Sequence, residues 1–389
     1  MKILRHTIYI LVALVGLLTG CGLIDEALEL CRENFSIVYR LRLITNMQTE
    51  MDDKLGDDRD LPLRLALEDH LKDIFTEYAH DVDLSFYDAD DPEGARLEHR
   101  TAIMDAGQAT YEIELPADNY FHLTLANLMD NDVVTHTGSD IRSTSYLDQP
   151  EGEAVESHNT GLFSARLPMT VRRNENQTFD VNLYMANDAA ALVVHRDSCD
   201  YTAIRGELLD LADGFFVADS LYEYDVNAGV KTVFVDAEPF VDEARRILEG
   251  GGTKAGDVDT TNVPFWTKMP GLLCGVGFAS RDASPHWAHV EGAIWRFVLY
   301  VTLQDGSVTR SVISLGERLP AGNLKIIRGW LRGNGGFVPG PPPEPPGPGP
   351  GPGPGPGPGP GPGPDDDNMV VGVSVTLNWQ EGMHFNPEL

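Results

Sequence analysis

The first strongly alternating segment of this chain reads Phe35-Ser36-Ile37-Val38-Tyr39-Arg40-Leu41-Arg42-Leu43. All of its odd positions are apolar, while serine and arginine take most of the even positions. Successive side chains of a strand point to opposite faces of a sheet, so a period of two is typical of a half-buried strand. The segment therefore predicts a sheet that packs one face on a core.

Further strands are expected along both halves of the chain. In the first half, alternating runs occur at residues 82–86, 111–115, 120–125, 162–167, 177–184 and 190–194. The turn-rich Pro116-Ala117-Asp118-Asn119 separates two of these runs and predicts a hairpin. In the second half, strands are expected at residues 214–224, 231–235, 292–303 and 308–315, and Asp305-Gly306 predicts a hairpin turn between the last two.

Two segments have helical periodicity instead. Apolar side chains recur at helical spacing among charged ones between residues 62 and 79, which predicts one amphipathic helix. A shorter helix is expected at 239–248, closed by the glycines at 250–252. Because the strands lie too close in sequence for regular βαβ crossovers, we predict a mainly β protein with two antiparallel β-sandwich domains and one or two short helices.

The length of 389 residues is enough for about two domains. We place an N-terminal β-sandwich domain at 34–195 and a C-terminal one at 196–338. Residues 339–366 are nearly all proline and glycine, with a strict Gly-Pro alternation at 347–364. This composition predicts a tether, and the period of two excludes collagen, where glycine stands at every third position. Beyond the tether, residues 367–389 hold a strand with one apolar face, formed by Val371, Val373, Val375, Leu377 and Trp379.

The N-terminus has the three-part pattern of a secretory signal. Basic residues precede an apolar stretch at 7–18, which is shorter than the roughly 20 residues of a membrane span. The stretch ends in Leu18-Thr19-Gly20-Cys21, which resembles the lipobox of bacterial lipoproteins. We therefore predict a signal peptide at 1–20, an acylated linker at 21–33, and N-palmitoyl and S-diacylglyceryl groups on Cys21, whose several acyl chains would give stable anchoring. An ordinary cleaved signal with an incidental cysteine is the alternative.

Charge limits the partners of the chain. It has 29 basic and 60 acidic residues and a formal net charge of −31. Phosphate-backbone ligands need clustered lysine and arginine, so we expect no nucleic acid partner. The same charge would repel anionic lipid head groups, so any membrane attachment should come from a covalent or inserted anchor. Acidic residues at 25, 26 and 29 resemble those that accompany surface display in lipoproteins, which favours a surface-exposed position on the outer membrane.

No segment has the spacing of a familiar catalytic or metal-binding motif. His286, His289 and Glu291 lie close together but lack a helix or a further ligand at the spacing of zinc sites. The aspartates at 88–91 resemble a calcium loop only superficially, because His99 stands where a bidentate glutamate is needed. We therefore predict a protein that is not an enzyme and has no metal or cofactor.

Three cysteines follow Cys21, namely Cys31, Cys199 and Cys274. At most one disulfide can form among them within the chain. Cys199 with Cys274 is one pairing that the spacing allows, and buried thiols are the other reading.

Together these features resemble the fimbrillin-A-associated anchor family, the lipid-linked minor subunits of donor-strand fimbriae in Gram-negative anaerobes. The resemblance rests on the lipobox cysteine and on residues 35–39, 115–128, 162–184 and 373–382. It implies two transthyretin-like sandwiches, an outer-membrane anchor, fimbrial (pilin) subunits as partners, and a role in attaching the fimbria and limiting its length. The Gly-Pro tether departs from the simplest family pattern and leaves the place of the last strand open.

Two readings of the strand at 371–379 remain. It could fill a groove in the next fimbrial subunit. It could instead return to complete its own second sandwich, and this reading is favoured because the tether keeps the strand at a high effective concentration near its own domain. A different class of function is a surface glycan-binding or adhesive lipoprotein whose exposed aromatics stack on sugars. Its candidate residues are Trp266, Trp287, Trp295 and Trp330, for each of which core packing is the alternative.

Overall fold

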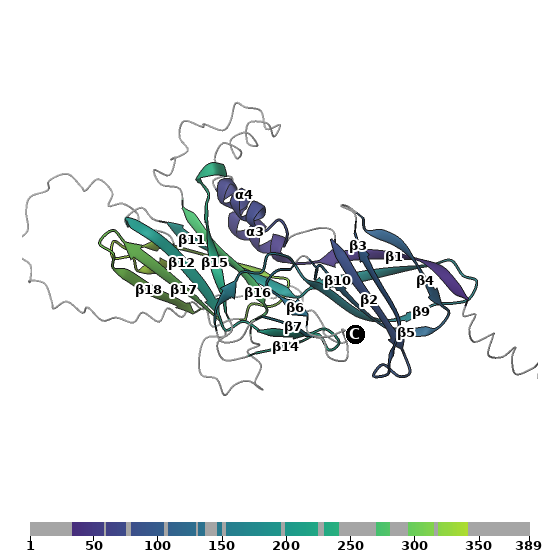
Figure 1. The fold of residues 1–389 in the computed structure, drawn as a ribbon. Helices are drawn as coiled ribbons and strands as arrows, with labels where there is room; N and C mark the ends of the chain where they lie inside the picture. Colours follow the sequence, from purple (N-terminus) through teal and green to yellow (C-terminus); the bar gives the residue numbers. More distant parts are fainter. Residues whose placement is uncertain are drawn as a thin grey trace, which may run out of the picture.

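The computed structural model describes most of the chain between residues 33 and 340, and this part consists of β-strands with two short α-helices (Figure 1). The expected mainly β fold is therefore confirmed, although the sheets also contain parallel pairs. The described residues are 33–57, 60–74, 79–104, 108–129, 131–136, 146–149, 153–195, 199–224, 229–240, 270–280, 295–314 and 318–340.

The first β-sandwich has β1 (Asn34–Ile44) in the middle of one layer. β1 runs parallel to β10 (Gln177–Met185) on one side and antiparallel to β4 (Thr110–Pro116) on the other. The second layer has the order β3-β2-β5-β9, with bounds Arg96–Ile103, Asp81–Asp88, Asn119–Ala126 and Phe163–Thr170. The strand predicted at 35–43 is thus confirmed, and its side chains Ile37 and Tyr39 are fully buried in the core.

The hairpin expected around residues 116–119 is wrong, although both of its strands exist. β4 pairs with β1, whereas β5 pairs with β2 and β9, so the two strands lie in different layers. The phenol of Tyr120 donates a hydrogen bond of 2.9 Å to the carbonyl of Pro116 across the turn. Leu115 and Tyr120 are both fully buried in the same core. The turn is a corner because both strands cover that core from opposite sides.

The helices differ from the single one predicted at 62–79. α4 (Leu61–His70) begins near the expected place, with Pro62 in its first turn, and ends earlier. A second helix, α3 (Met47–Leu55), precedes it and buries Met47, Met51 and Leu55. This four-residue spacing is the helical signal in the sequence from which α3 could have been predicted. The helix expected at 239–248 lies mostly outside the described residues, apart from a short 3₁₀ turn at Glu238–Phe240.

The second half forms a larger sheet with the order β18-β17-β12-β15-β16-β11-β19-β20. The bounds in that order are Val308–Ser314, Arg296–Leu303, Tyr201–Leu209, Gly229–Asp236, Gly271–Phe278, Asn187–His195, Leu324–Leu331 and Phe337–Pro339. β8 (Val155–Glu156) pairs with β15. The hairpin expected at Asp305-Gly306 is confirmed, because β17 pairs with β18 and Gly306 has a φ of 83°, which glycine adopts without strain.

A small third sheet lies against both halves. Its order is β14-β13-β7-β6, with bounds Leu221–Glu223, Gly214–Phe216, Tyr146–Asp148 and Thr135–His136. Phe215 of this sheet shares a buried cluster with Leu123 of β5 and Phe278 of β16. The small sheet therefore covers part of the first sandwich and also contacts the second half.

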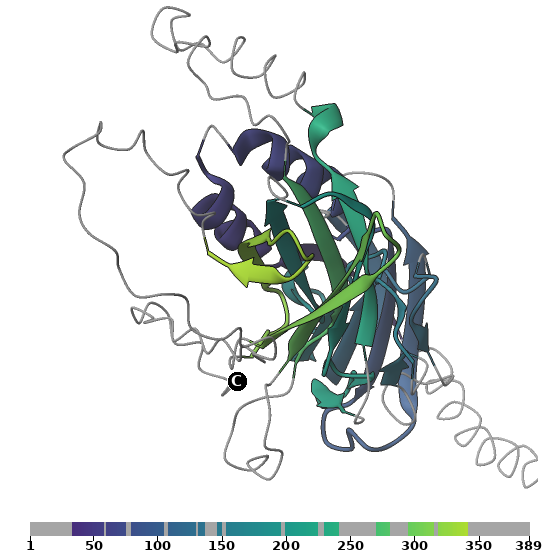
Figure 2. The same ribbon diagram turned by 90° about the vertical axis from the view of Figure 1, so that its left-hand side faces the viewer.

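β11 is buried along its whole length, and its side chains alternate between two cores. Ala189, Ala191 and Val193 join the core that the first sandwich shares with the helices, while Leu192 and Val194 join a core on the other face of the second sheet. The helices cover the same face, because α3 contacts β19 and α4 contacts β15 and β16 (Figure 2). One hydrophobic core thus runs from the first sandwich into the second half.

This pairing bears on the predicted domain limits. The strand expected at 190–194 was placed at the end of the first domain, yet β11 lies between β16 and β19 of the second sheet. We therefore propose that the boundary lies at Ala186, between β10 and β11, and that the helices at 47–70 serve the second sheet although they precede most of the first sandwich.

The two described cysteines do not form a disulfide with each other. Cys274 belongs to the core shared by the first sandwich and the helices, and Cys199 belongs to the core on the other face of the second sheet. The pairing that the spacing allowed is therefore wrong, because the sheet separates the two thiols. Burial raises the pKa of Cys274 to about 12, which keeps this thiol protonated.

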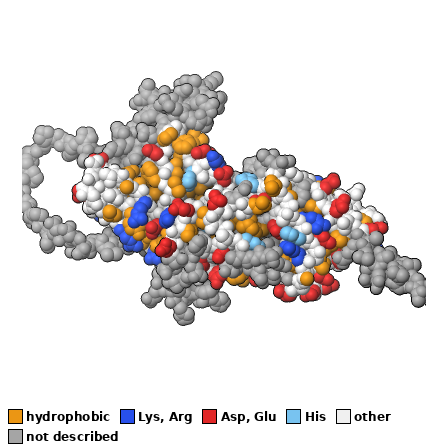
Figure 3. Space-filling view, viewed as in Figure 1, with side chains coloured by type: hydrophobic (Ala, Val, Ile, Leu, Met, Phe, Trp, Pro, Cys, Tyr) orange, Lys and Arg blue, Asp and Glu red, His pale blue; other side chains and the backbone are white. Residues whose placement is uncertain are grey.

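Hydrophobic side chains also remain on the surface of the second half. Figure 3 shows them gathered over this half beside the helices. Val233, Val308 and Val312 are exposed apolar residues of β15 and β18.

A buried polar group joins the two halves at the start of β11. The side-chain oxygen of Asn187 accepts a hydrogen bond of 2.5 Å from the backbone N–H of Leu162, and its nitrogen donates one of 2.8 Å to Nδ1 of His158. His158 in turn lies 3.0 Å through Nε2 from Oε1 of Gln149, and its backbone N–H donates to the carbonyl of Val276. Asn187 is fully buried, so each of these bonds replaces one that water would otherwise make.

We expect Asn187→Ala to lower the free energy of unfolding by about 2–3 kcal/mol, because it leaves a buried N–H and a buried imidazole nitrogen without partners. Urea unfolding followed by tryptophan fluorescence measures this loss. The matched control is Asn182→Ala on the exposed face of β10, which should change the stability by less than about 0.5 kcal/mol. Equal effects of the two substitutions would contradict the role of Asn187 as a junction residue.

Candidate functional site

β1 is held by side-chain contacts across the sandwich as well as by its neighbouring strands. The hydroxyl of Tyr39 on β1 lies 2.5 Å from Nε2 of His122 and 3.0 Å from Oγ1 of Thr124, both on β5. Nδ1 of His122 donates to the backbone carbonyl of Ser85 at 3.0 Å, and its ring stacks on Phe86 at 4.2 Å between ring centres. With the Nδ1 proton donated, Nε2 is left to accept from the hydroxyl of Tyr39. The cluster therefore ties β1 to the opposite layer.

These groups stay neutral because they are buried. Burial lowers the pKa of His122 to about 4 and raises the pKa of Tyr39. Neither side chain is exposed to solvent, so neither can reach a substrate. Their arrangement is that of a satisfied core network, which positions strands and does not carry out chemistry.

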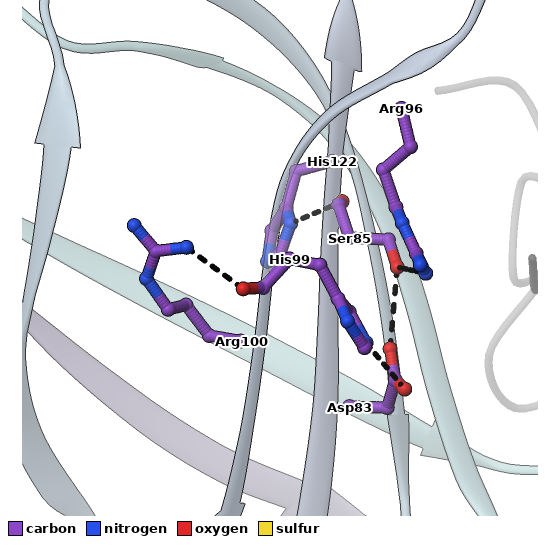
Figure 4. A network of polar contacts seen from close by, with 6 residues as sticks. All are labelled: Asp83, Ser85, Arg96, His99, Arg100 and His122. Carbon is purple, nitrogen blue, oxygen red and sulfur yellow. Dashed lines mark hydrogen bonds and ion pairs between the residues drawn. The ribbon is translucent and has the colours of Figure 1, made fainter.

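A second polar group lies beside this cluster on β2 and β3 (Figure 4). Nε2 of His99 lies 2.8 Å from Oδ2 of Asp83, and the hydroxyl of Ser85 donates to Oδ1 of the same carboxylate at 3.2 Å. Arg96 donates to the hydroxyl of Ser85 at 3.2 Å. These are contacts between paired neighbouring strands, so we interpret them as support for the edge strand β3.

Most residues singled out from the sequence lie outside the described residues. These are Cys21, Cys31, Trp266, His286, Trp287, His289, Glu291, Val371, Val373, Val375, Leu377 and Trp379. Lipidation and the strand-exchange role of 371–379 therefore stay predictions. The aspartates at 88–91 form a turn in which Oδ1 of Asp88 accepts from the backbone N–H of Asp90 at 2.8 Å.

Of the tryptophans of the glycan-binding alternative, the two that the structure describes, Trp295 and Trp330, are not the exposed platform that it requires. Trp295 is 1% exposed and belongs to the core of the second sheet, so its role in stacking on sugars is wrong. Trp330 on β19 is half-buried. The packing alternative therefore holds for Trp295, because inward positions of that sheet fill its core.

A groove of about 510 Å³ lies where the first sandwich meets the small sheet. β9 and β10 form two of its walls, since they pair with each other only at Phe163–Met185 and Ser164–Tyr184 before following separate layers. The third wall comes from β13, β14 and the turn between them, including Phe215 and Tyr222. Tyr184 on β10 is 50% exposed at this groove. The groove has no signal in the sequence, because its walls come from segments that are far apart in the chain.

No helix among the described residues has the length and apolar character needed to cross a membrane. Within the same residues, no group of three or more histidine, cysteine, aspartate or glutamate side chains is placed to hold a metal ion.

Residues 56–203 match the model of a family described as fimbrillin-A associated anchor proteins Mfa1 and Mfa2. Over these residues the chain is similar to that family. The matched region is less than half of the chain and runs from the end of α3 to the start of β12. It therefore contains α4, most of the first sandwich, and the strand β11, which is buried on both faces. The resemblance inferred from the sequence is confirmed, whereas no curated protein matches the chain.

Several solved structures are similar to this chain. A candidate adhesin from Bacteroides thetaiotaomicron is 10% identical with a TM-score of 0.45, and the match covers 79% of this chain and 95% of that chain. A fimbrial assembly protein from Parabacteroides distasonis is 10% identical with a TM-score of 0.37, covering 77% and 92%. The C-terminally truncated tip fimbrial protein Mfa3 from Porphyromonas gingivalis is 11% identical with a TM-score of 0.35, covering 77% and 95%. Scores below 0.5 transfer no residue's role to this chain.

The buried histidines predict how stability depends on pH. The pKa of His122 falls from 6.5 to about 4 on folding, and that of His158 to about 3, both because of burial. Between pH 6.5 and the pKa of the folded state, each histidine binds more protons in the unfolded chain than in the folded protein. The free energy of unfolding is therefore fully retained above pH 6.5 and falls as the pH drops toward 4. Each histidine contributes a slope of up to about 1.4 kcal/mol per pH unit.

We therefore expect His122→Phe, which can still stack on Phe86, to reduce this slope between pH 6.5 and 4 by about 1.4 kcal/mol per pH unit. Urea unfolding at a series of pH values measures the slope. Thr124→Val is the control, because it removes a hydrogen-bond partner of the same cluster without removing a titrating group. It should lower stability at every pH and leave the slope unchanged. If His122→Phe had the same slope as the unsubstituted protein, burial would not lower the pKa of His122 as we expect.

Proposed function

We propose that this chain is an outer-membrane lipoprotein, exposed at the cell surface, that serves as an anchor or accessory subunit of a donor-strand fimbria. In this role it attaches the fibre to the cell and limits its length. The match of residues 56–203 to the model of the fimbrillin-A associated anchor proteins supports the assignment to fimbriae. The place of β1 in the first sandwich is the observation that carries the anchoring role.

β1 is suited to transmit tension from a lipid anchor at Cys21. It pairs with β10 over residues 37–44 and with β4 over residues 34–40, so it has hydrogen-bonded neighbours on both sides. A pull along the strand must break these bonds together, whereas a pull on an unpaired end would release them one at a time. The linker at 21–33 spans at most about 45 Å when fully extended, which would keep the first sandwich close to the membrane.

The same strand offers a reason for limited fibre length. β1 occupies the position between β10 and β4, and Tyr39 secures it from the core side. A subunit whose own strand fills this position has no need of a strand from another subunit there. We infer that the chain ends the fibre on that side, at its base. The strand at 371–379 would then be available to a fimbrial subunit or to its own second sheet, and both readings remain open.

Anchoring is tested in cells that carry Cys21→Ala at matched expression. We expect the substitution to release the protein and to move fimbriae from the envelope to the medium, because the acyl chains can no longer be attached. Counting fimbriae on cells and measuring fimbrial polymer in the medium gives the result. Cys31→Ala, in the same N-terminal segment, is the control and should keep both on the cell. Fimbriae that stay attached while the Cys21→Ala protein is lost would contradict the anchoring role.

The place of the last strand is tested by deleting residues 366–389. If the strand completes the second sandwich, the shortened protein should melt at a lower temperature than the full chain, because an apolar face and a strand ladder are lost. Thermal unfolding followed by circular dichroism measures the difference. Removing only residues 382–389, which lie beyond the apolar strand, is the matched control. Unchanged melting of the larger deletion would rule out self-pairing and favour donation of the strand to a fimbrial subunit.

A further inference from the structure

We propose that the groove between the β9–β10 corner and the β13–β14 turn binds a neutral glycan, with Tyr184 as the stacking platform and Asn182, Asp180 and Arg166 as hydrogen-bonding groups. The volume of about 510 Å³ lies within the range of about 300–1,000 Å³ that is typical of small-molecule sites. The site differs from the tryptophans considered in the sequence, and it does not depend on the anchoring role.

Tyr184 is the exposed aromatic side chain of the groove, and it is of the kind that sugar rings contact. Tyr184 is 50% exposed on an outward position of β10, so one side of the residue is open to a ligand. The buried side chain of Phe215 and the partly buried Tyr222 form the wall on the side of the small sheet, with their rings 4.9 Å apart, so they shape the groove and leave the stacking to Tyr184. The hydroxyl of Tyr222 donates to the carbonyl of Ala186 at 2.9 Å, which holds this wall in place. An aromatic face beside polar groups suits a ligand whose rings have apolar C–H faces and polar edges.

The polar side chains provide both donors and acceptors. Asn182 is exposed and makes no side-chain hydrogen bond to any described residue, so its amide can donate and accept. Asp180 contacts Arg40 only at 3.7 Å, with both side chains mostly exposed. Arg166 donates one hydrogen bond of 3.2 Å to the carbonyl of Ala218, which leaves further donors on its guanidinium group. Hydroxyl groups both donate and accept, and this mixed set matches them.

The net charge of the chain and the proline on the edge of β9 both bear on the class of ligand that the groove binds. The formal net charge of −31 would repel sulfated or uronic-acid-rich glycans, so we assign neutral ones. A protein strand added along the edge of β9 is the main rival occupant. Pro168 in β9 has no backbone N–H, and proline on an edge strand discourages such pairing. The mixed polar and aromatic lining therefore favours a sugar over an added strand.

The test uses the full-length chain in detergent. Binding is first screened on an array of neutral, sialylated and sulfated glycans. Saturation-transfer difference NMR then measures the binding of N-acetyllactosamine, mannotriose and any neutral glycan that binds on the array. We expect binding of at least one neutral glycan, and at least a tenfold weaker affinity in Tyr184→Ala. Asn182→Ala should also weaken binding, whereas Tyr184→Phe should retain the stacking and most of the affinity.

Tyr300→Ala is the matched control, because it removes a half-buried tyrosine of β17 that is outside the groove and should leave binding unchanged. Urea midpoints for every variant show that each is folded. Failure of the full chain to bind any neutral glycan, or equal binding by Tyr184→Ala and the parent, would overturn the proposal. A photocrosslinker at position 184 that captures a fimbrial subunit in cells would also overturn it, because the groove would then be a protein interface. Loss of anchoring in Cys21→Ala changes none of these outcomes.

Discussion

The burial of β11 on both faces is the constraint on which the rest of the structure depends. Alternate side chains of this strand enter two different cores, and its backbone pairs with β16 on one side and β19 on the other. A strand in this position cannot move without exposing apolar surface to water on one side or the other. Because one of these cores continues into the first sandwich and the helices, the two halves of the chain are packed against each other and not merely linked.

This packing gives the proposed function a mechanical basis. Tension applied at Cys21 would enter the protein through β1, which has partners on both sides and the Tyr39–His122 contact beneath it. The shared core and the buried contacts of Asn187 would carry that tension into the second half. An anchor needs such continuity, because a weak junction between the membrane and the fibre would open first.

The buried histidines His122 and His158 hold strands in position. His122 and His158 are held neutral by burial, and each has hydrogen-bond partners on both ring nitrogens. Such groups specify how strands from different layers meet, since any other arrangement would leave them without partners. The groove at Tyr184 has the opposite character, because its polar groups are exposed and largely available to a ligand.

The sequence by itself determined the mainly β class, strand β1, the Asp305-Gly306 hairpin and the family resemblance, because these depend on local period, turn chemistry and short motifs. Only the tertiary structure decided that β4 and β5 form a corner, that β11 belongs to the second sheet, and that Trp295 is buried. It also separated Cys199 from Cys274 and assembled the groove from three distant segments. An alternating pattern shows that one face of a strand is buried, but the partner that covers this face is set by packing between residues far apart in the chain.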